Sequence, residues 1–235
     1  MGSTLPRGWL VDTVALYGRV FRRAAGLALR NWPVGLVVIV YGVLLEVAML
    51  FAGPLGIVGR FLVYLAGIAC VSSWLSLVAV VLRTGRVRLE DVPTSFSTYF
   101  GDLLNVGFLF WGIQLIASLV LAPFAFLRIV FGLAVIVFLN AVPELVYVGR
   151  HSATEVFVES YRFIGENWIE WFPANLVIAA AIVAVSNVPD GPFGIVNVGA
   201  LGIVLYFGMI VRGLLFQELT TSSRRAREFR RRAAS

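Results

Sequence analysis

The sequence is poor in charged side chains and contains no lysine. Charged residues make up 14% of its 235 residues, whereas soluble globular domains carry about 25%. All nineteen basic residues are arginines, and the formal net charge is +6 at pH 7. The low charge excludes an ordinary soluble domain. We attribute the absence of lysine to a GC-rich genome rather than to function.

Cysteine and histidine each occur once, as Cys70 and His151. A single cysteine excludes a disulfide bridge within the chain. A metal site needs several ligands, and no second histidine or cysteine lies near His151 in the sequence. Motifs typical of serine hydrolases, phosphate-binding loops and zinc proteases are also missing. We therefore expect no enzyme activity, no metal and no cofactor.

Apolar residues are abundant: they make up 60% of the chain, and the mean hydropathy is +0.91. A helix needs ~20 mostly apolar residues to cross a bilayer, and the sequence offers six such segments. We predict an all-α integral membrane protein, with a single six-helix domain over 1–218 and a tail over 219–235. The predicted transmembrane segments are 33–51, 57–82, 103–122, 124–142, 171–186 and 193–216.

Turns rich in glycine and proline join these segments into three helical hairpins. The turns lie at 52–56, at Pro123 and at 187–192. An amphipathic stretch precedes each hairpin, at about 9–30, 91–102 and 153–168. Helices with one apolar and one charged face lie flat in the membrane interface. We therefore expect three amphipathic surface helices.

The arginines are distributed unevenly along the chain. Sixteen of the nineteen lie in the N-terminal region, in the loops after the second and fourth segments, and in the tail. The other three turns contain none, although Arg60 and Arg128 follow two of them closely. Short cytoplasmic loops are enriched in Lys and Arg. We therefore predict a multi-pass protein of the cytoplasmic membrane, with both termini and the surface helices on the cytoplasmic side.

Shifting the chain by 136 residues places about 17–82 onto 153–218 and indicates an internal repeat. The identical pairs are Val20 and Val156, Phe21 and Phe157, Asn31 and Asn167, and Trp32 and Trp168. The charged faces have opposite sign: the first copy carries Arg19, Arg23 and Arg30, and the second Glu155, Glu159 and Glu166. We hypothesise that these faces pair, at ~0–1 kcal/mol per exposed pair. In the alternative, the arginines meet anionic lipid and the glutamates meet water.

Charged residues within membrane segments are costly and usually have a purpose. Glu46 and Arg60 lie at similar predicted depths in the first two segments and form one candidate pair. Glu144 and Arg212, at the inner ends of the fourth and sixth segments, form another. Amides that could link segments, at ~0.6 kcal/mol per hydrogen bond, are Gln114, Asn140, Asn175 and Asn197. We favour a structural role for these groups over a transport path, for which Glu46 is the only candidate.

The C-terminal tail is rich in arginine. Its arginines are Arg224, Arg225, Arg227, Arg230, Arg231 and Arg232. They could anchor the topology, bind anionic lipid at about 1 kcal/mol per arginine, or dock an acidic protein partner. Nucleic-acid binding is not expected, because the tail contains no aromatic residue other than Phe229 and the sequence shows no nucleic-acid recognition fold.

The segment V-G-R-H-S-A-T-E-V-F-V-E-S-Y-R-F-I-G-E-N-W follows a proline-ended apolar segment. It resembles a group of six-helix membrane proteins that includes the membrane domain attached to some glycerophosphoryl diester phosphodiesterases. Ser160, Asn167 and Trp168 fit the pattern of that group. The resemblance implies the same six-helix architecture, and it implies no activity, because the phosphodiesterase domain is absent.

Together, these features predict a non-enzymatic scaffold or accessory subunit that works through its cytoplasmic helices and basic tail. The first alternative is a permease-type transporter subunit with a separate ATPase as its partner. The second alternative, which rests on family analogy, is a lipid-binding or lipid-handling membrane protein. In each case the expected partners are the bilayer, anionic lipid headgroups and a protein complex.

Overall fold

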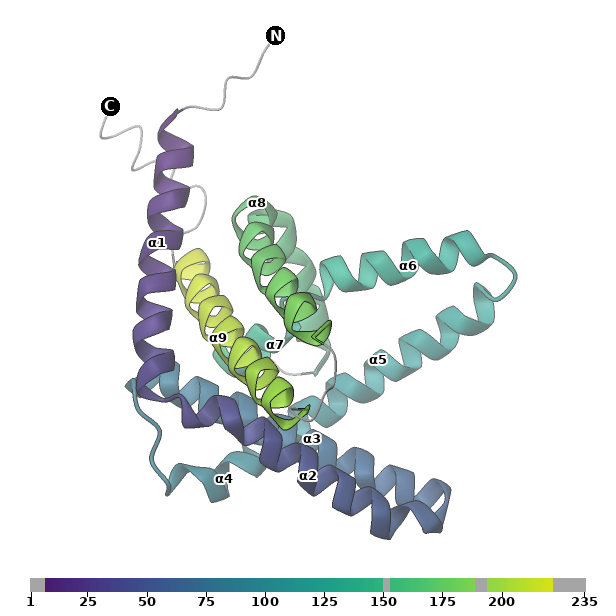
Figure 1. The fold of residues 1–235 in the computed structure, drawn as a ribbon. Coiled ribbons are helices and arrows are strands. Elements are labelled where there is room, and N and C mark those ends of the chain that lie inside the picture. Colours follow the sequence, from purple (N-terminus) through teal and green to yellow (C-terminus); the bar gives the residue numbers. More distant parts are fainter. Residues whose placement is uncertain (1–6, 150–152, 189–193, 222–235) are drawn as a thin grey trace.

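The computed structural model describes residues 7–149, 153–188 and 194–221, and every regular element in these ranges is helical (Figure 1). Six of the helical stretches are long and apolar enough to cross a membrane. The prediction of an all-α chain with six such helices is therefore confirmed.

The helices follow one another with short connections. In chain order they are α1 (Arg7–Arg30), α2 (Pro33–Ala52), η1 (Gly53–Leu55), α3 (Ile57–Thr84), α4 (Asp91–Thr98), α5 (Phe100–Val120), α6 (Ala125–Phe138), α7 (Val142–Glu144), η2 (Leu145–Gly149), α8 (Ala153–Ser186) and α9 (Gly194–Thr221). η2 is a short π-helical segment. Helices α2 and α3 contact each other, as do α8 and α9, and α9 also contacts α1 and α2.

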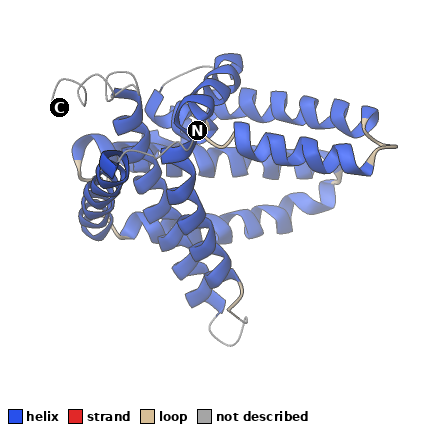
Figure 2. Cartoon of the chain, turned by 90° about the horizontal axis from the view of Figure 1, so that it is seen from above, coloured by secondary structure: helices blue, strands red, loops and turns tan. Residues whose placement is uncertain are grey.

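The buried core lies at one end of the molecule. It is built by α1, the C-terminal part of α3, η2, α8 and α9, and its largest buried side chains include Trp171 and Tyr206. Helices α5 and α6 contribute no buried residue and project away from the other helices (Figures 1 and 2). Large apolar side chains such as Phe108 and Ile129 are exposed on them. Such a surface is suited to hydrocarbon rather than to water.

Asn31 fixes the corner between α1 and α2. Its Nδ2 donates to the carbonyl oxygens of Leu27 at 2.9 Å and Gly85 at 3.0 Å, and its Oδ1 accepts the Val87 N–H at 3.0 Å. Gly85 ends α3 with φ +77°, a conformation that glycine adopts without strain. Pro33 then begins α2 in the first turn, where its missing N–H costs little. One amide thus ties α1 to the loop after α3.

Serines fasten the short helix α4 to α3. The Ser73 hydroxyl shares a hydrogen bond of 2.5 Å with Ser95 of α4 and another with Tyr41 of α2. The Ser72 hydroxyl accepts the backbone N–H of Tyr99 at 2.9 Å, at the break between α4 and α5. These side chains are buried. Each polar group is therefore satisfied inside the protein, as burial requires.

The structure differs from the predicted boundaries at four places. Helix α9 continues to Thr221, beyond the predicted ends of the sixth segment and the domain at 216 and 218. The second surface helix, α4, ends at Thr98 rather than 102, and α5 begins at Phe100. The third surface helix and the fifth segment form one continuous helix, α8, which runs through Pro173. At ~1.5 Å per residue it is ~51 Å long, so it exceeds the ~30 Å hydrocarbon layer. In the fourth segment, α6 ends at Phe138, before the predicted residue 142, and is followed by α7 and η2.

Replacing Asn31 by alanine removes three hydrogen bonds and leaves the partly buried Val87 N–H without its acceptor. We expect Asn31→Ala to lower the free energy of unfolding by about 1–3 kcal/mol. Asn187→Ala is the matched control, because the exposed Asn187, directly after α8, bonds through its amide only to the Val183 backbone oxygen among the described residues. Denaturation in mild detergent measures both variants. Equal losses would contradict the role assigned to Asn31.

Candidate functional site

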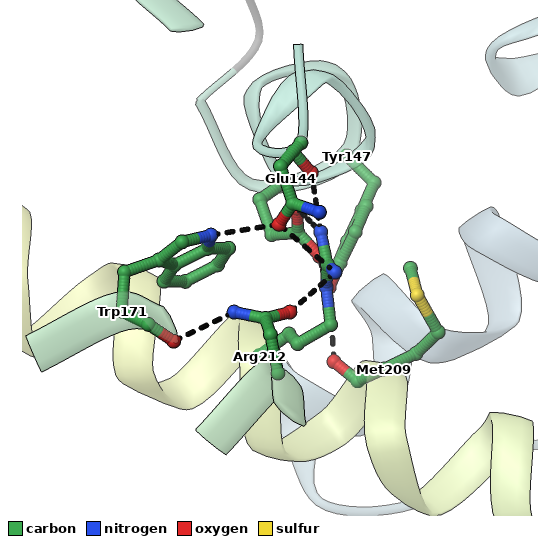
Figure 3. Close-up of polar contacts among 7 residues, drawn as sticks. Glu144, Tyr147, Trp171, Met209 and Arg212 are labelled. Carbon is green, nitrogen blue, oxygen red and sulfur yellow. Dashed lines mark hydrogen bonds and ion pairs between the residues drawn. The ribbon is translucent and has the colours of Figure 1, made fainter. Parts of the chain in front are cut away.

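A buried ion pair joins α7 to α9 (Figure 3). Nε and Nη2 of Arg212 each lie 2.7 Å from an oxygen of the Glu144 carboxylate, so the contact is bidentate. The Glu144 side chain is 0% exposed and that of Arg212 14%. Bidentate pairs of this kind combine strength with a fixed geometry. The structure thus brings together the two residues that the sequence suggested as a pair.

The remaining N–H groups of Arg212 meet amides from two other elements. Nη1 donates to Oδ1 of Asn175 on α8 at 2.5 Å and to Oδ1 of Asn140 at 3.3 Å. Nη2 donates to the Asn140 backbone oxygen at 2.5 Å. Since the guanidinium has five N–H donors, all of them are used. Asn140 and Asn175 are two of the four amides that the sequence offered as links between segments.

Trp171 of α8 completes this cluster from the side. Its ring centroid lies 5.1 Å from the Arg212 guanidinium carbon, a cation–π distance. Its indole N–H donates to Oδ1 of Asn140 at 2.8 Å, and its backbone oxygen accepts from Asn175 at 2.7 Å. Sequence reasoning missed Trp171 as a member of the cluster. In a sequence, a tryptophan four residues before an asparagine in a helix only weakly indicates such a polar cluster.

Tyr147 extends the same network along η2. Its hydroxyl donates to the backbone oxygen of Met209 on α9 at 3.0 Å, as Figure 3 shows. Its own backbone oxygen accepts from the Tyr99 hydroxyl at 3.2 Å. The irregular segment after α6 is therefore held on both sides by tyrosine side chains. Together with the saturated guanidinium, these contacts make the cluster a structural junction.

Glu46 and Arg60 do not form the predicted pair: both are exposed, and neither has an ion pair with any residue that the structure describes. The hydrogen bond between Tyr41 and Ser73 fixes the register of α2 against α3. In that register Arg60 lies about eight residues, or ~12 Å, nearer the turn than Glu46. The sequence analysis placed Glu46 and Arg60 at similar depths in the membrane. That prediction was wrong because it took no account of the register between α2 and α3.

The predicted pairing of the two charged helix faces is also wrong. No ion pair between the arginine and glutamate sets occurs among the described residues, and Glu159 instead pairs with Arg162 on its own helix at 3.0 Å. Helix α1 reaches α8 through Tyr17, whose hydroxyl donates to the Glu170 backbone oxygen at 2.7 Å. At 3.6 residues per turn, the arginines point roughly 120–160° away from Tyr17. They therefore face away from α8.

Helix α1 has three faces rather than two. The face packed in the core carries Leu16, Val20 and Ala24. The sequence analysis named Val20 only as a repeat identity and did not predict that this face is buried. A second face exposes Val14 and Leu29. The third face carries the exposed residues Arg19, Arg22, Arg23 and Arg30.

Three of these arginines surround a shallow hollow. Arg19, Arg22 and Arg23 line it together with Ala15 and Gly18, and its volume is about 450 Å³. The small residues leave room between the guanidinium groups. Within the described part of the chain, the structure gives none of these arginines an ion pair. The hollow is therefore an open, positively charged surface.

Tyr17 holds the part of α1 that carries this hollow against α8. Burial and then the charge of Glu170 raise the pKa of the Tyr17 hydroxyl to about 12. The hydroxyl therefore keeps its proton, and its hydrogen bond to α8, throughout the physiological pH range. The arginine-rich tail from Arg224 to Arg232 and His151 lie outside the described residues.

Removing Glu144 should leave a buried, unpaired guanidinium. We expect Glu144→Ala to lower the free energy of unfolding by about 3–5 kcal/mol, and the double variant Glu144→Leu, Arg212→Met to recover most of that loss. The control is Glu159→Ala, which breaks an exposed pair worth at most about 1 kcal/mol. Denaturation in detergent compares the three variants. A double variant as unstable as the single one would contradict the assignment of the cost to the unpaired charge.

Comparisons with known proteins identified no relative of this chain. A scan against protein-family models, a search of curated proteins and a search of solved structures each found no match. The resemblance to the membrane domain of glycerophosphoryl diester phosphodiesterases therefore stays a prediction from the sequence.

Proposed function

We propose that the protein is a non-enzymatic accessory or scaffold subunit of a membrane complex, and that it binds its protein partner through α1. The observation that carries this proposal is the hollow lined by Arg19, Arg22 and Arg23. Three cations within about one turn and a half of helix repel one another, and the described residues offer them no carboxylate. An acidic surface on a partner would supply the missing charge.

The anchoring of α1 supports this function. The helix is held by its buried face, by the Tyr17 hydrogen bond and by Asn31 at its C-terminal end. A surface that is already fixed loses little conformational entropy when a partner binds. Charge complementarity would then set the orientation and association rate of the complex.

The proposed topology places α1 on the cytoplasmic side of the cytoplasmic membrane. The six helical stretches form three hairpins in this arrangement: α2 with α3, α5 with α6, and α8 with α9. Arg83, Arg86 and Arg88 lie at the same end as Asn31 and the C-terminus of α1, whereas the turn at Gly53–Leu55 has no charge. This distribution is typical of a cytoplasmic and an outer side.

Local geometry supports the proposed repeat of 17–82 in 153–218. Asn31 and Asn167 each donate from Nδ2 to the carbonyl oxygen four residues earlier, at 2.9 and 3.0 Å. Trp32 and Trp168 are exposed to nearly the same degree, 56% and 55%. The corresponding residues Val20 and Val156 are both buried. We infer that the two copies use the same face of the helix for packing.

The permease-type alternative gains no support from the described residues. The hollows between α2, α3 and α5 are lined without charged side chains, and a solute or ion path would need polar groups at depth. The lipid-binding alternative is compatible with those hollows and with the scaffold function.

Cysteine labelling tests the topology, because the natural Cys70 is buried and can be replaced by alanine. In that background, Leu55→Cys in the turn after α2 and Ser97→Cys on α4 are both exposed positions. We expect a membrane-impermeant maleimide to label Leu55→Cys in intact cells and Ser97→Cys only after permeabilisation. The opposite pattern would invert the topology and place α1 outside the cell.

Purification of the full chain from its native membrane in mild detergent tests the partner. We expect a protein partner at near-stoichiometric yield, as measured by quantitative mass spectrometry. In the triple variant Arg19→Glu, Arg22→Glu, Arg23→Glu, its yield should fall about ten-fold or more, because the charges that attract it are reversed.

The matched control reverses the same amount of charge at three exposed arginines near the end of α3: Arg83→Glu, Arg86→Glu, Arg88→Glu. This control should keep the partner. Equal loss from both triple variants would show a nonspecific charge effect. Purification of the unaltered chain with lipid alone would end the accessory-subunit proposal.

A further inference from the structure

A hollow of about 330 Å³ lies between η2, α8 and the C-terminal end of α9. Helices α8 and α9 contact each other and lie side by side (Figure 1). The apolar part of the lining includes Phe163 and Phe216, whose ring centroids are 4.7 Å apart. The charged part consists of Glu159, Arg162 and Glu166. The hollow therefore combines an apolar surface with a negative net charge.

The two carboxylates of the hollow differ in their partners. Glu159 pairs with Arg162 on the same helix at 3.0 Å. Glu166 is exposed and has no ion pair with any residue that the structure describes. Because the Glu159 pair is neutral, one negative charge remains at Glu166. This carboxylate is accessible to a cation that enters the hollow.

The lining suits a basic side chain with an apolar stem. An arginine can lay its methylene groups on Phe163 and Phe216 while its guanidinium reaches a carboxylate. An anionic ligand would be repelled by Glu166, and a hydrocarbon chain would cover polar groups that need partners. The described residues contain no group of three side chains that could hold a metal ion. The chemistry of the hollow thus points to an arginine or a lysine.

The chain itself supplies arginines at this place. Thr220 lines the hollow, and α9 ends one residue later, at Thr221. The following segment, 222–232, contains six arginines and one glutamate, so its net charge is +5. Arg224 comes three residues after Thr221, and three residues span at most ~11 Å. The first arginines of this segment are therefore tethered close to the hollow.

Tethering favours this segment over a basic segment of a separate protein. A short linker gives the attached group a roughly millimolar effective concentration at its site. Exposed ion pairs are individually weak, so a free ligand with one or two of them would bind poorly. The same contacts are sufficient for a segment that already begins beside its site.

We propose that the hollow between η2, α8 and α9 is the docking site of the chain's own arginine-rich segment, and that Arg224 and Arg225 bind Glu166. The docked segment ties the end of α9 to α8. Anionic lipid headgroups attract the same arginines, so the hollow and the membrane surface compete for them. The inference is independent of the partner of α1 and of the topology, because the segment begins at the hollow in either orientation.

Disulfide crosslinking tests the docking. In a Cys70→Ala background, Val148→Cys lies in the hollow and Ala226→Cys follows Arg225. The full chain is reconstituted in nanodiscs that contain phosphatidylglycerol, whose headgroups compete for the segment. The control combines Ala226→Cys with Val158→Cys, an exposed position of α8 outside the hollow. We expect the pair in the hollow to form an intramolecular disulfide about ten-fold faster than the control pair.

Charge reversal tests the contact with Glu166. We expect Glu166→Arg to slow the crosslink in the hollow about five-fold, because repulsion replaces attraction. The control Glu155→Arg makes the same change at an exposed position of α8 outside the hollow and should leave the rate unchanged. Adding Arg224→Glu and Arg225→Glu to Glu166→Arg should restore the rate, because opposite charges then face each other again.

Other outcomes overturn the proposal. Equal rates for the hollow and control pairs would show random collisions of the segment with the surface. A rate that Glu166→Arg leaves unchanged, or that the exchanged charges do not restore, would remove the proposed contact. A crosslink that forms in phosphatidylcholine nanodiscs and is lost with phosphatidylglycerol would assign the segment to lipid. A disulfide between two copies would assign the hollow to self-association.

Discussion

The guanidinium of Arg212 is buried where α7, α8 and α9 meet, and each of its N–H groups has an acceptor there. Glu144 supplies the countercharge, and Asn140 and Asn175 supply the remaining oxygens. A buried charge that loses its partner is strongly destabilising. The three elements are therefore constrained to one relative arrangement. The end of α6, the irregular η2 and the course of α8 all depend on it.

Polar side chains perform the same task elsewhere at this end of the molecule. Asn31 joins α1 to the loop after α3, and serines join α4 to α3 and α2. Among the described residues, fewer such links lie at the opposite ends of the helices, where Asn197 donates to the Val188 backbone oxygen at 3.5 Å, and α5 and α6 bury no residue. Lipid tails are as apolar as leucine, so apolar contact alone gives little drive for association in a membrane. Specific polar contacts thus hold one end together while the other end stays open.

This division relates the structure to the proposed functions. The fixed end presents Arg19, Arg22 and Arg23 on a rigid helix, as a docking surface requires. The open end leaves two hollows along α3 that are lined without charged side chains.

The apolar segments and their lengths determined the all-α class and the six long helices, because hydrophobic run length is a local property of the chain. The choice of Glu144 and Arg212 also followed from the sequence, since charges at segment ends need partners. Tertiary structure alone decided which charges meet. The register set by Tyr41 and Ser73 separated Glu46 from Arg60, and the rotation of α1 turned its arginines away from α8. Register and helix rotation depend on contacts between distant residues, which periodicity along one chain does not encode.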